Sequence, residues 1–83
     1  MENRFTFEII KHIGVLSAVR RDGAHWKKEL NIISWNRREP RFDIREWNDD
    51  HSKMSKGITL SGDEIRKVFS LLQEAQKAEK EAI

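Results

Sequence analysis

The chain contains no cysteine among its 83 residues. It can therefore form neither a disulfide framework nor a thiolate metal site, and it has no thiol nucleophile. No apolar run approaches the length of a membrane-spanning helix, and the first residues lack the basic and apolar segments of a secretory signal. The sequence predicts a cytoplasmic protein with no membrane partner.

Convergent polar groups of the kind that enzymes need are also missing. The three histidines, His12, His25 and His51, are far apart and lack the spacing of helical metal ligands. No glycine-rich phosphate loop, nucleophile elbow or pair of carboxylates stands out. We therefore expect no catalysis, no metal, no cofactor and no small-molecule substrate.

The size of the chain predicts one domain, residues 1–83, with a core over residues 5–72. A chain of 83 residues with 37% hydrophobic content is near the lower limit at which the hydrophobic core of a single copy can stabilise a fold. Small folds without disulfides or metals often complete their burial with a second copy. A homodimer is the expected state.

Alternating apolar residues predict a series of antiparallel strands. Residues 5–19 read as one strand, or two short strands with a bend at Gly14. The Asp-Gly pair at 22–23 predicts a tight turn into a strand over residues 25–35. A connection at 36–40 leads to a strand at 41–47, and a polar loop at 48–55 precedes a short strand at 56–60.

A single helix is expected after these strands. Ser61 precedes Glu64 by three residues, which is the spacing of a capping box. An amphipathic stripe follows, and we expect it to cover the sheet, a partner copy or both; its predicted dimer contacts are Ile65, Val68, Phe69 and Leu72. Residues 76–83 are charged and predict a frayed tail. The fold class is α+β, a four-stranded antiparallel meander followed by a C-terminal helix.

The middle of the chain combines aromatic and basic residues. Residues 20–47 contain eight Lys or Arg against five acidic residues. Period-two alternation places two tryptophans and several basic residues on the face opposite the apolar one, which we expect to be open to solvent. Stacking on aromatics and neutralisation of phosphates are how proteins bind unpaired nucleotides. The predicted contacts are Lys27, Lys28, Trp35, Arg37, Arg38, Arg41, Arg45, Trp47 and Lys56.

Other interpretations of the same residues stay open. Trp26, Trp35 and Trp47 could belong to the core or a dimer interface, and Arg41 and Arg45 could pair with neighbouring carboxylates. The tryptophan face could also dock a protein partner, and the nucleic acid could be single-stranded RNA.

The motifs DIREW and KGITLS, separated by a polar loop and leading into a helix, add a resemblance. Together with KHIGVL, KELNIISWN and REPRFDIREW they are similar to the C-terminal domain of the positive-cofactor-four type transcriptional coactivators, in particular its small bacterial members. The resemblance covers about residues 5–72.

This resemblance implies a homodimer that is formed largely through the helix. The homodimer would bind single-stranded DNA across the sheets of its two protomers, and we expect it to associate with the nucleoid. The resemblance places the family's arginine at Arg45, its aromatic residues at Trp35 and Trp47, and its lysine at Lys56. Coactivator members often carry two consecutive aromatic residues after Arg-Glu, whereas in this sequence Asn48 occupies the second of these positions. We expect a role in transcription, replication or repair.

Overall fold

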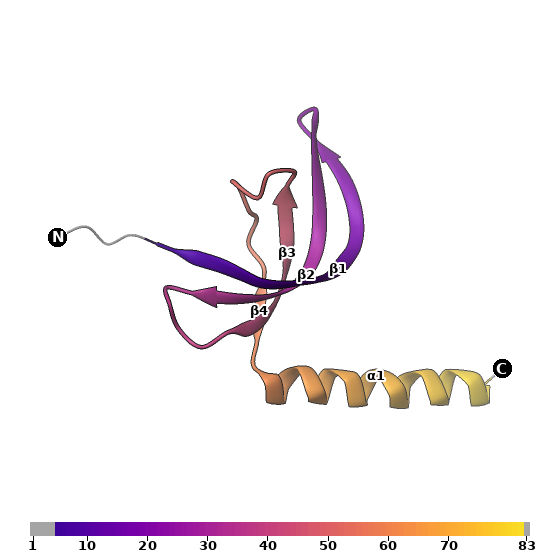
Figure 1. Cartoon of the computed structure of the whole chain (residues 1–83). Helices are drawn as coiled ribbons and strands as arrows, with labels where there is room; N and C mark the ends of the chain where they lie inside the picture. Colours follow the sequence, from indigo (N-terminus) through magenta and orange to yellow (C-terminus); the bar gives the residue numbers. More distant parts are fainter. Residues whose placement is uncertain (1–4, 83) are drawn as a thin grey trace.

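The computed structural model describes residues 5–82, and the side chains of residues 5–79. The elements follow in the order β1 (Phe7–Arg21), β2 (Ala24–Trp35), β3 (Arg41–Asn48), β4 (Ile58–Leu60) and α1 (Gly62–Ala82). Adjacent strands pair antiparallel in the order β1-β2-β3-β4, and the helix extends to one side of the sheet (Figure 1). The predicted meander followed by one helix is confirmed.

Both hairpin turns use left-handed backbone conformations. Asp22 and Gly23 have φ of 48° and 78° between Arg21 and Ala24, which are paired in the sheet. This is the mirror-image turn that an Asp-Gly pair favours, because its twist matches that of the strands. In the second connection Asn36 and Arg37 have φ of 51° and 63°. The amide oxygen of Asn36 accepts a hydrogen bond from the Thr6 N–H, which ties this turn to the start of β1.

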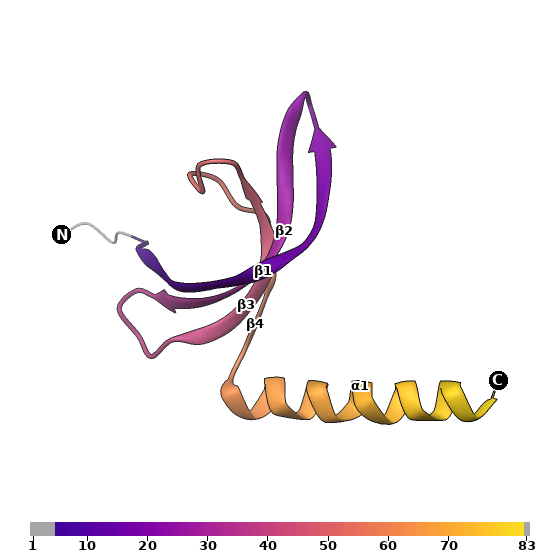
Figure 2. The same ribbon diagram turned by 45° about the vertical axis from the view of Figure 1, so that its right-hand side comes forward.

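The sheet is strongly bent, and the aromatic contacts show in which direction. Phe7 is paired with Trp35 at one end of β2, whereas Trp47 is paired with Lys27 near the other end. The rings of Phe7 and Trp47 nevertheless lie 5.1 Å apart. Two ends of one strand can approach so closely only if the face that carries these rings is concave. Figures 1 and 2 show β1 and β2 turning sharply midway along their length.

Irregular pairing along β1 accompanies the bend. The register between β1 and β2 shifts three times, between Ile9 and Lys11, between His12 and Gly14, and between Val15 and Ser17. Each shift inserts one extra residue, which increases local twist and bending. The bend predicted at Gly14 therefore belongs to a longer irregular segment, and β1 remains one continuous strand.

The two faces of the sheet differ in composition. The concave face carries Phe7, Ile9, His12, Val15, Lys27, Glu29, Asn31, Ile33, Trp35, Arg41, Asp43, Arg45, Trp47 and Thr59, as the strand register sets it. The convex face carries Trp26, Leu30, Ile32, Phe42, Ile44, Ile58 and Leu60. The alternating apolar residues of β2, β3 and β4 thus share the convex face. However, the residues below 2% exposure, Trp47, Ile33, Asn31 and Asp43, all belong to the concave face.

Helix α1 begins with the predicted capping box. The Ser61 N–H donates to Glu64 Oε1 at 2.9 Å, and the Glu64 N–H donates to Ser61 Oγ at 3.1 Å. Asp63 and Glu64 place negative charge at the positive end of the helix dipole. Both effects define where the helix starts.

The rest of the helix rules out one of the alternatives that the sequence left open. It contacts the sheet only near β3 and β4, so within one chain it does not cover the sheet (Figure 2). Ile65 is half-buried, while Val68, Phe69 and Leu72 are exposed. The helix is described as far as Ala82, and the Gln, Lys, Glu and Ala residues of its last turns are strong helix formers. Fraying from residue 76 stays a prediction, and Ile83 lies outside the described residues. The helix is not long and apolar enough to cross a membrane.

Candidate nucleic-acid interface

A buried ion pair occupies the middle of the concave face. Arg45 Nε and Nη2 donate to the two carboxylate oxygens of Asp43 at 2.6 and 2.7 Å, and the Thr59 hydroxyl donates to Asp43 Oδ2 at 2.9 Å. Asp43 is fully buried. A bidentate ion pair of this kind fixes both side chains, so the guanidinium of Arg45 is already hydrogen-bonded to a residue of its own chain.

The same guanidinium lies over an indole. Arg45 Cζ is 4.5 Å from the ring centroid of Trp35, within the range of a cation–π contact. One face of Trp35 is thus covered by Arg45. The proposed DNA contact of Arg45 remains a prediction, but the structure gives this residue a role in the fold.

Trp47 does not have the exposure that alternation predicted. Its exposed fraction is 0%, and its ring packs against Phe7 at 5.1 Å and His51 at 5.3 Å. The bend of the sheet encloses it, whereas a flat sheet would have left it open to solvent. The expectation that Trp47 points into solvent was therefore wrong, and in this conformation it offers no surface for a base.

An exposed aromatic residue lies beside the half-buried Trp35. Phe5 is 61% exposed, and its ring centroid lies 5.4 Å from that of Trp35. Phe7 packs 5.9 Å from the same indole. The Phe-Thr-Phe alternation at residues 5–7 was visible in the sequence, but only the folded chain shows that it meets Trp35. Phe5 is a candidate contact that sequence reasoning missed.

A buried carboxylate lies further along the concave face. Glu29 is 3% exposed, and its Oε1 accepts a hydrogen bond from Asn31 Nδ2 at 3.0 Å. His51 Nε2 approaches the two oxygens at 2.9 and 3.1 Å. Burial raises the pKa of Glu29, but hydrogen bonds from Asn31 and His51 and the charges of His51 and His12 outweigh it, and the net pKa lies below the ordinary value. Glu29 is therefore ionised at neutral pH.

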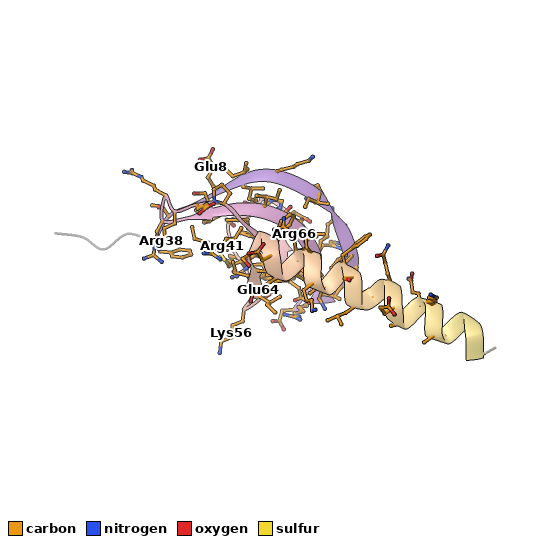
Figure 3. The ribbon with its side chains drawn as sticks, turned by 90° about the horizontal axis from the view of Figure 1, so that it is seen from below. Glu8, Arg38, Arg41, Lys56, Glu64 and Arg66 are labelled. Atoms are coloured by element: carbon orange, nitrogen blue, oxygen red, sulfur yellow. The ribbon has the colours of Figure 1, made fainter. Side chains whose placement is uncertain are left out.

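The predicted basic contacts fall into two groups. Arg37 and Arg38 are exposed in the turn that directly follows Trp35, and Arg41 is exposed at the start of β3. Figure 3 shows Arg38 and Arg41 on the same part of the molecule. Among residues 5–79 no carboxylate pairs with any of these three arginines. Together with the exposed Lys27, they form what we name the basic rim of the concave face.

Lys28 and Lys56 form the second group. Both line a hollow with Arg21, Glu46 and Gly57, and alternation places Lys28 on the convex face. Lys56 extends away from the ribbon (Figure 3). A methyl group at Gly57 would overlap Arg45 Cβ and the carbonyl oxygen of Ile44, so Gly57 allows this loop to pack closely against β3. The structure thus separates Lys28 and Lys56 from the aromatic cluster.

These features define the class of protein. The chain is a small module in which a bent four-stranded antiparallel sheet, with aromatic side chains and a basic rim on its concave face, precedes a single C-terminal helix. Within residues 5–79 no three His, Cys, Asp or Glu side chains form a group suited to a metal ion.

Comparison with known proteins gives the family. Residues 23–71 match the family described as Transcriptional Coactivator p15 (PC4), and an uncharacterized protein of Treponema pallidum (strain Nichols) is 44% identical over 68 residues, which are 82% of this chain and 76% of the relative. The chain therefore belongs to the PC4 family. The family's domain is a non-catalytic nucleic-acid-binding domain, and membership implies binding of single-stranded DNA in general.

Proposed function

We propose that the protein binds single-stranded DNA with little sequence specificity, across the concave faces of a homodimer. The observation that carries the proposal is the cluster of Phe5, Phe7 and Trp35 beside the turn with Arg37 and Arg38, for which no carboxylate among residues 5–79 forms an ion pair. The exposed ring of Phe5 and the half-buried ring of Trp35 provide a surface on which any base can stack, and the neighbouring cations neutralise phosphates. Duplex DNA hides the faces of its bases, so it fits this surface poorly.

The homodimer is supported by apolar surface that a single chain leaves open. On α1, Phe69, Leu71 and Leu72 are 63%, 57% and 58% exposed. On the sheet, the three extra residues at the register shifts of β1, Ile10, Ile13 and Leu16, are exposed as well. Exposed apolar surface of this extent is characteristic of an interface. A second copy would place two concave faces in one assembly.

Binding of single-stranded DNA is tested by fluorescence anisotropy. We expect the protein to bind an oligothymidine more tightly than the matching duplex, and to lose affinity steeply as salt is raised. Phe5→Ala and Trp35→Ala should each weaken binding at least about fivefold, since a stacked base contributes about 1–3 kcal/mol. Trp26→Ala, which removes an indole from the convex face, is the control and should have little effect.

The other candidate partners give different results in the same assay. Equal or tighter binding of the duplex would refute the proposal. A preference for oligouridine would identify RNA as the target. Attachment of a protein partner to the aromatic cluster would be nearly independent of salt, because apolar docking releases no counterions.

A further inference from the structure

Two histidines from different elements flank the buried Glu29. His12 comes from β1 and His51 from the loop between β3 and β4. His12 Nδ1 lies 2.7 Å from Asn31 Oδ1 and 3.6 Å from Glu29 Oε1, and His51 Nε2 is within hydrogen-bonding distance of both Glu29 oxygens. The side chains of His12 and His51 are 51% and 36% exposed, against 4% for Glu29. Both rings therefore stand between this carboxylate and the solvent.

Each ring keeps a nitrogen free for a second proton. The nitrogens that face Asn31 Oδ1 and the Glu29 carboxylate must carry hydrogen, because their partners are acceptors. Among the described residues, nothing is hydrogen-bonded to His12 Nε2 or to His51 Nδ1. Protonation there would leave the existing hydrogen bonds intact and add an N–H donor and a positive charge to the concave face.

The neighbouring charges leave Glu29 as the negative group of this cluster. Lys27 lines the same cavity of about 300 Å³, together with Ile9, Val15 and Asn31. Arg45 is opposite Glu29 in the register, but its guanidinium is paired with Asp43. On the loop, Asp50 accepts a hydrogen bond from the Ser52 N–H. An ionised Glu29 repels phosphates, and two protonated imidazoles would more than offset that charge.

We propose that His12 and His51 are proton-linked contacts for single-stranded DNA, so that binding takes up protons and tightens as the pH falls. The inference rests on the proposed function and gives it a pH dependence. Histidine is the side chain whose charge ordinarily changes between about pH 5 and pH 8. A phosphate beside a protonated imidazole favours that form, and by linkage the protonated form favours the phosphate.

The dissociation constant for oligothymidine, measured at constant ionic strength, tests the inference. Neither thymine nor the phosphodiester changes charge over this interval, so any pH dependence originates in the protein. For the unaltered protein we expect the constant to rise about tenfold between about pH 6 and pH 8. In the double variant His12→Gln with His51→Gln it should rise less than about twofold.

The third histidine provides a matched control. His25 lies next to the β1–β2 turn, where its Nε2 is 3.1 Å from Arg20 Nη2. The variant His25→Gln should keep the full pH dependence. An unchanged pH dependence in the double variant, or its loss in His25→Gln, would overturn the inference.

A second variant tests the inference independently, in case the double variant has a folding defect. Glu29→Gln keeps the shape of the side chain and removes the negative charge, so it should bind about threefold to tenfold more tightly at about pH 8 with a smaller pH dependence. Weaker binding by a variant with an unaltered circular dichroism spectrum would count against the inference. An unaltered protein that binds at every pH with one affinity refutes only this inference, whereas failure to bind at any pH refutes the proposed function as well.

Discussion

The concave face differs from the opposite surface, which the convex face and α1 form, in how much of it a single chain buries. On the concave face, Glu29, Asn31 and Asp43 are buried and hydrogen-bonded to neighbours within the same chain. On the other surface, Ile58, Phe69 and Leu72 are each more than half exposed. A single chain buries the polar side chains at the centre of the concave face, whereas the convex face and the helix keep large apolar side chains exposed.

This difference predicts which measurement each substitution changes. Removal of a side chain enclosed by the concave face should change the free energy of unfolding. Removal of an exposed apolar side chain from the helix should change association, and removal of a cation from the basic rim should change DNA binding. The predictions below are ordered from the largest expected effect to the smallest.

Trp47→Ala should have the largest effect. Truncation of a fully buried aromatic residue leaves a cavity and costs about 3–5 kcal/mol of unfolding free energy. Urea denaturation followed by circular dichroism measures this loss. Phe5→Ala, from the exposed edge of the connected aromatic cluster, should cost less than about 1 kcal/mol. A stable Trp47→Ala variant with weakened DNA binding would instead make Trp47 a stacking residue.

Phe69→Asp should separate the proposed dimer. The substitution places a charge in the apolar stripe of α1, where it would be buried by the second copy without a partner. We expect the dissociation constant of the dimer to rise at least about a hundredfold in sedimentation equilibrium. Lys67→Asp, on the opposite side of the helix, introduces the same charge and should leave the dimer intact. A monomeric unaltered protein would contradict the proposed assembly.

Local signals in the sequence were sufficient to predict the elements. The Asp22-Gly23 turn, the alternation on either side of it and the Ser61–Glu64 capping box each depend on residues close together in the chain. Their physical causes are backbone conformation and short-range hydrogen bonds, which a sequence displays directly. Membership of the PC4 family was likewise predicted from contiguous motifs.

The direction of the bend could not be predicted in the same way. Period-two alternation assigns Trp35 and Trp47 to one face but does not tell whether that face is concave. The bend brings Phe7 onto Trp47 and places Arg45 over Trp35, contacts between residues that are distant along β2 and its partners. The sequence therefore predicted the members of the face correctly, but it predicted the exposure of Trp47 incorrectly. The contact between His51 and Glu29 could not be predicted either, because nothing local in the sequence links the two residues.

The smallest expected effect compares single cations on the two faces. Arg41 belongs to the basic rim, whereas Lys28 lies in the hollow near Glu46 and Lys56. Arg41→Ala should weaken oligothymidine binding about threefold and lower the slope of log affinity against log salt by about one, because one fewer phosphate is neutralised. Lys28→Ala removes the same charge from the convex side and should leave that slope unchanged. Equal slopes for the two variants would mean that the affinity for DNA depends on the total charge of the protein. This result would contradict the proposal that the concave face is the binding surface.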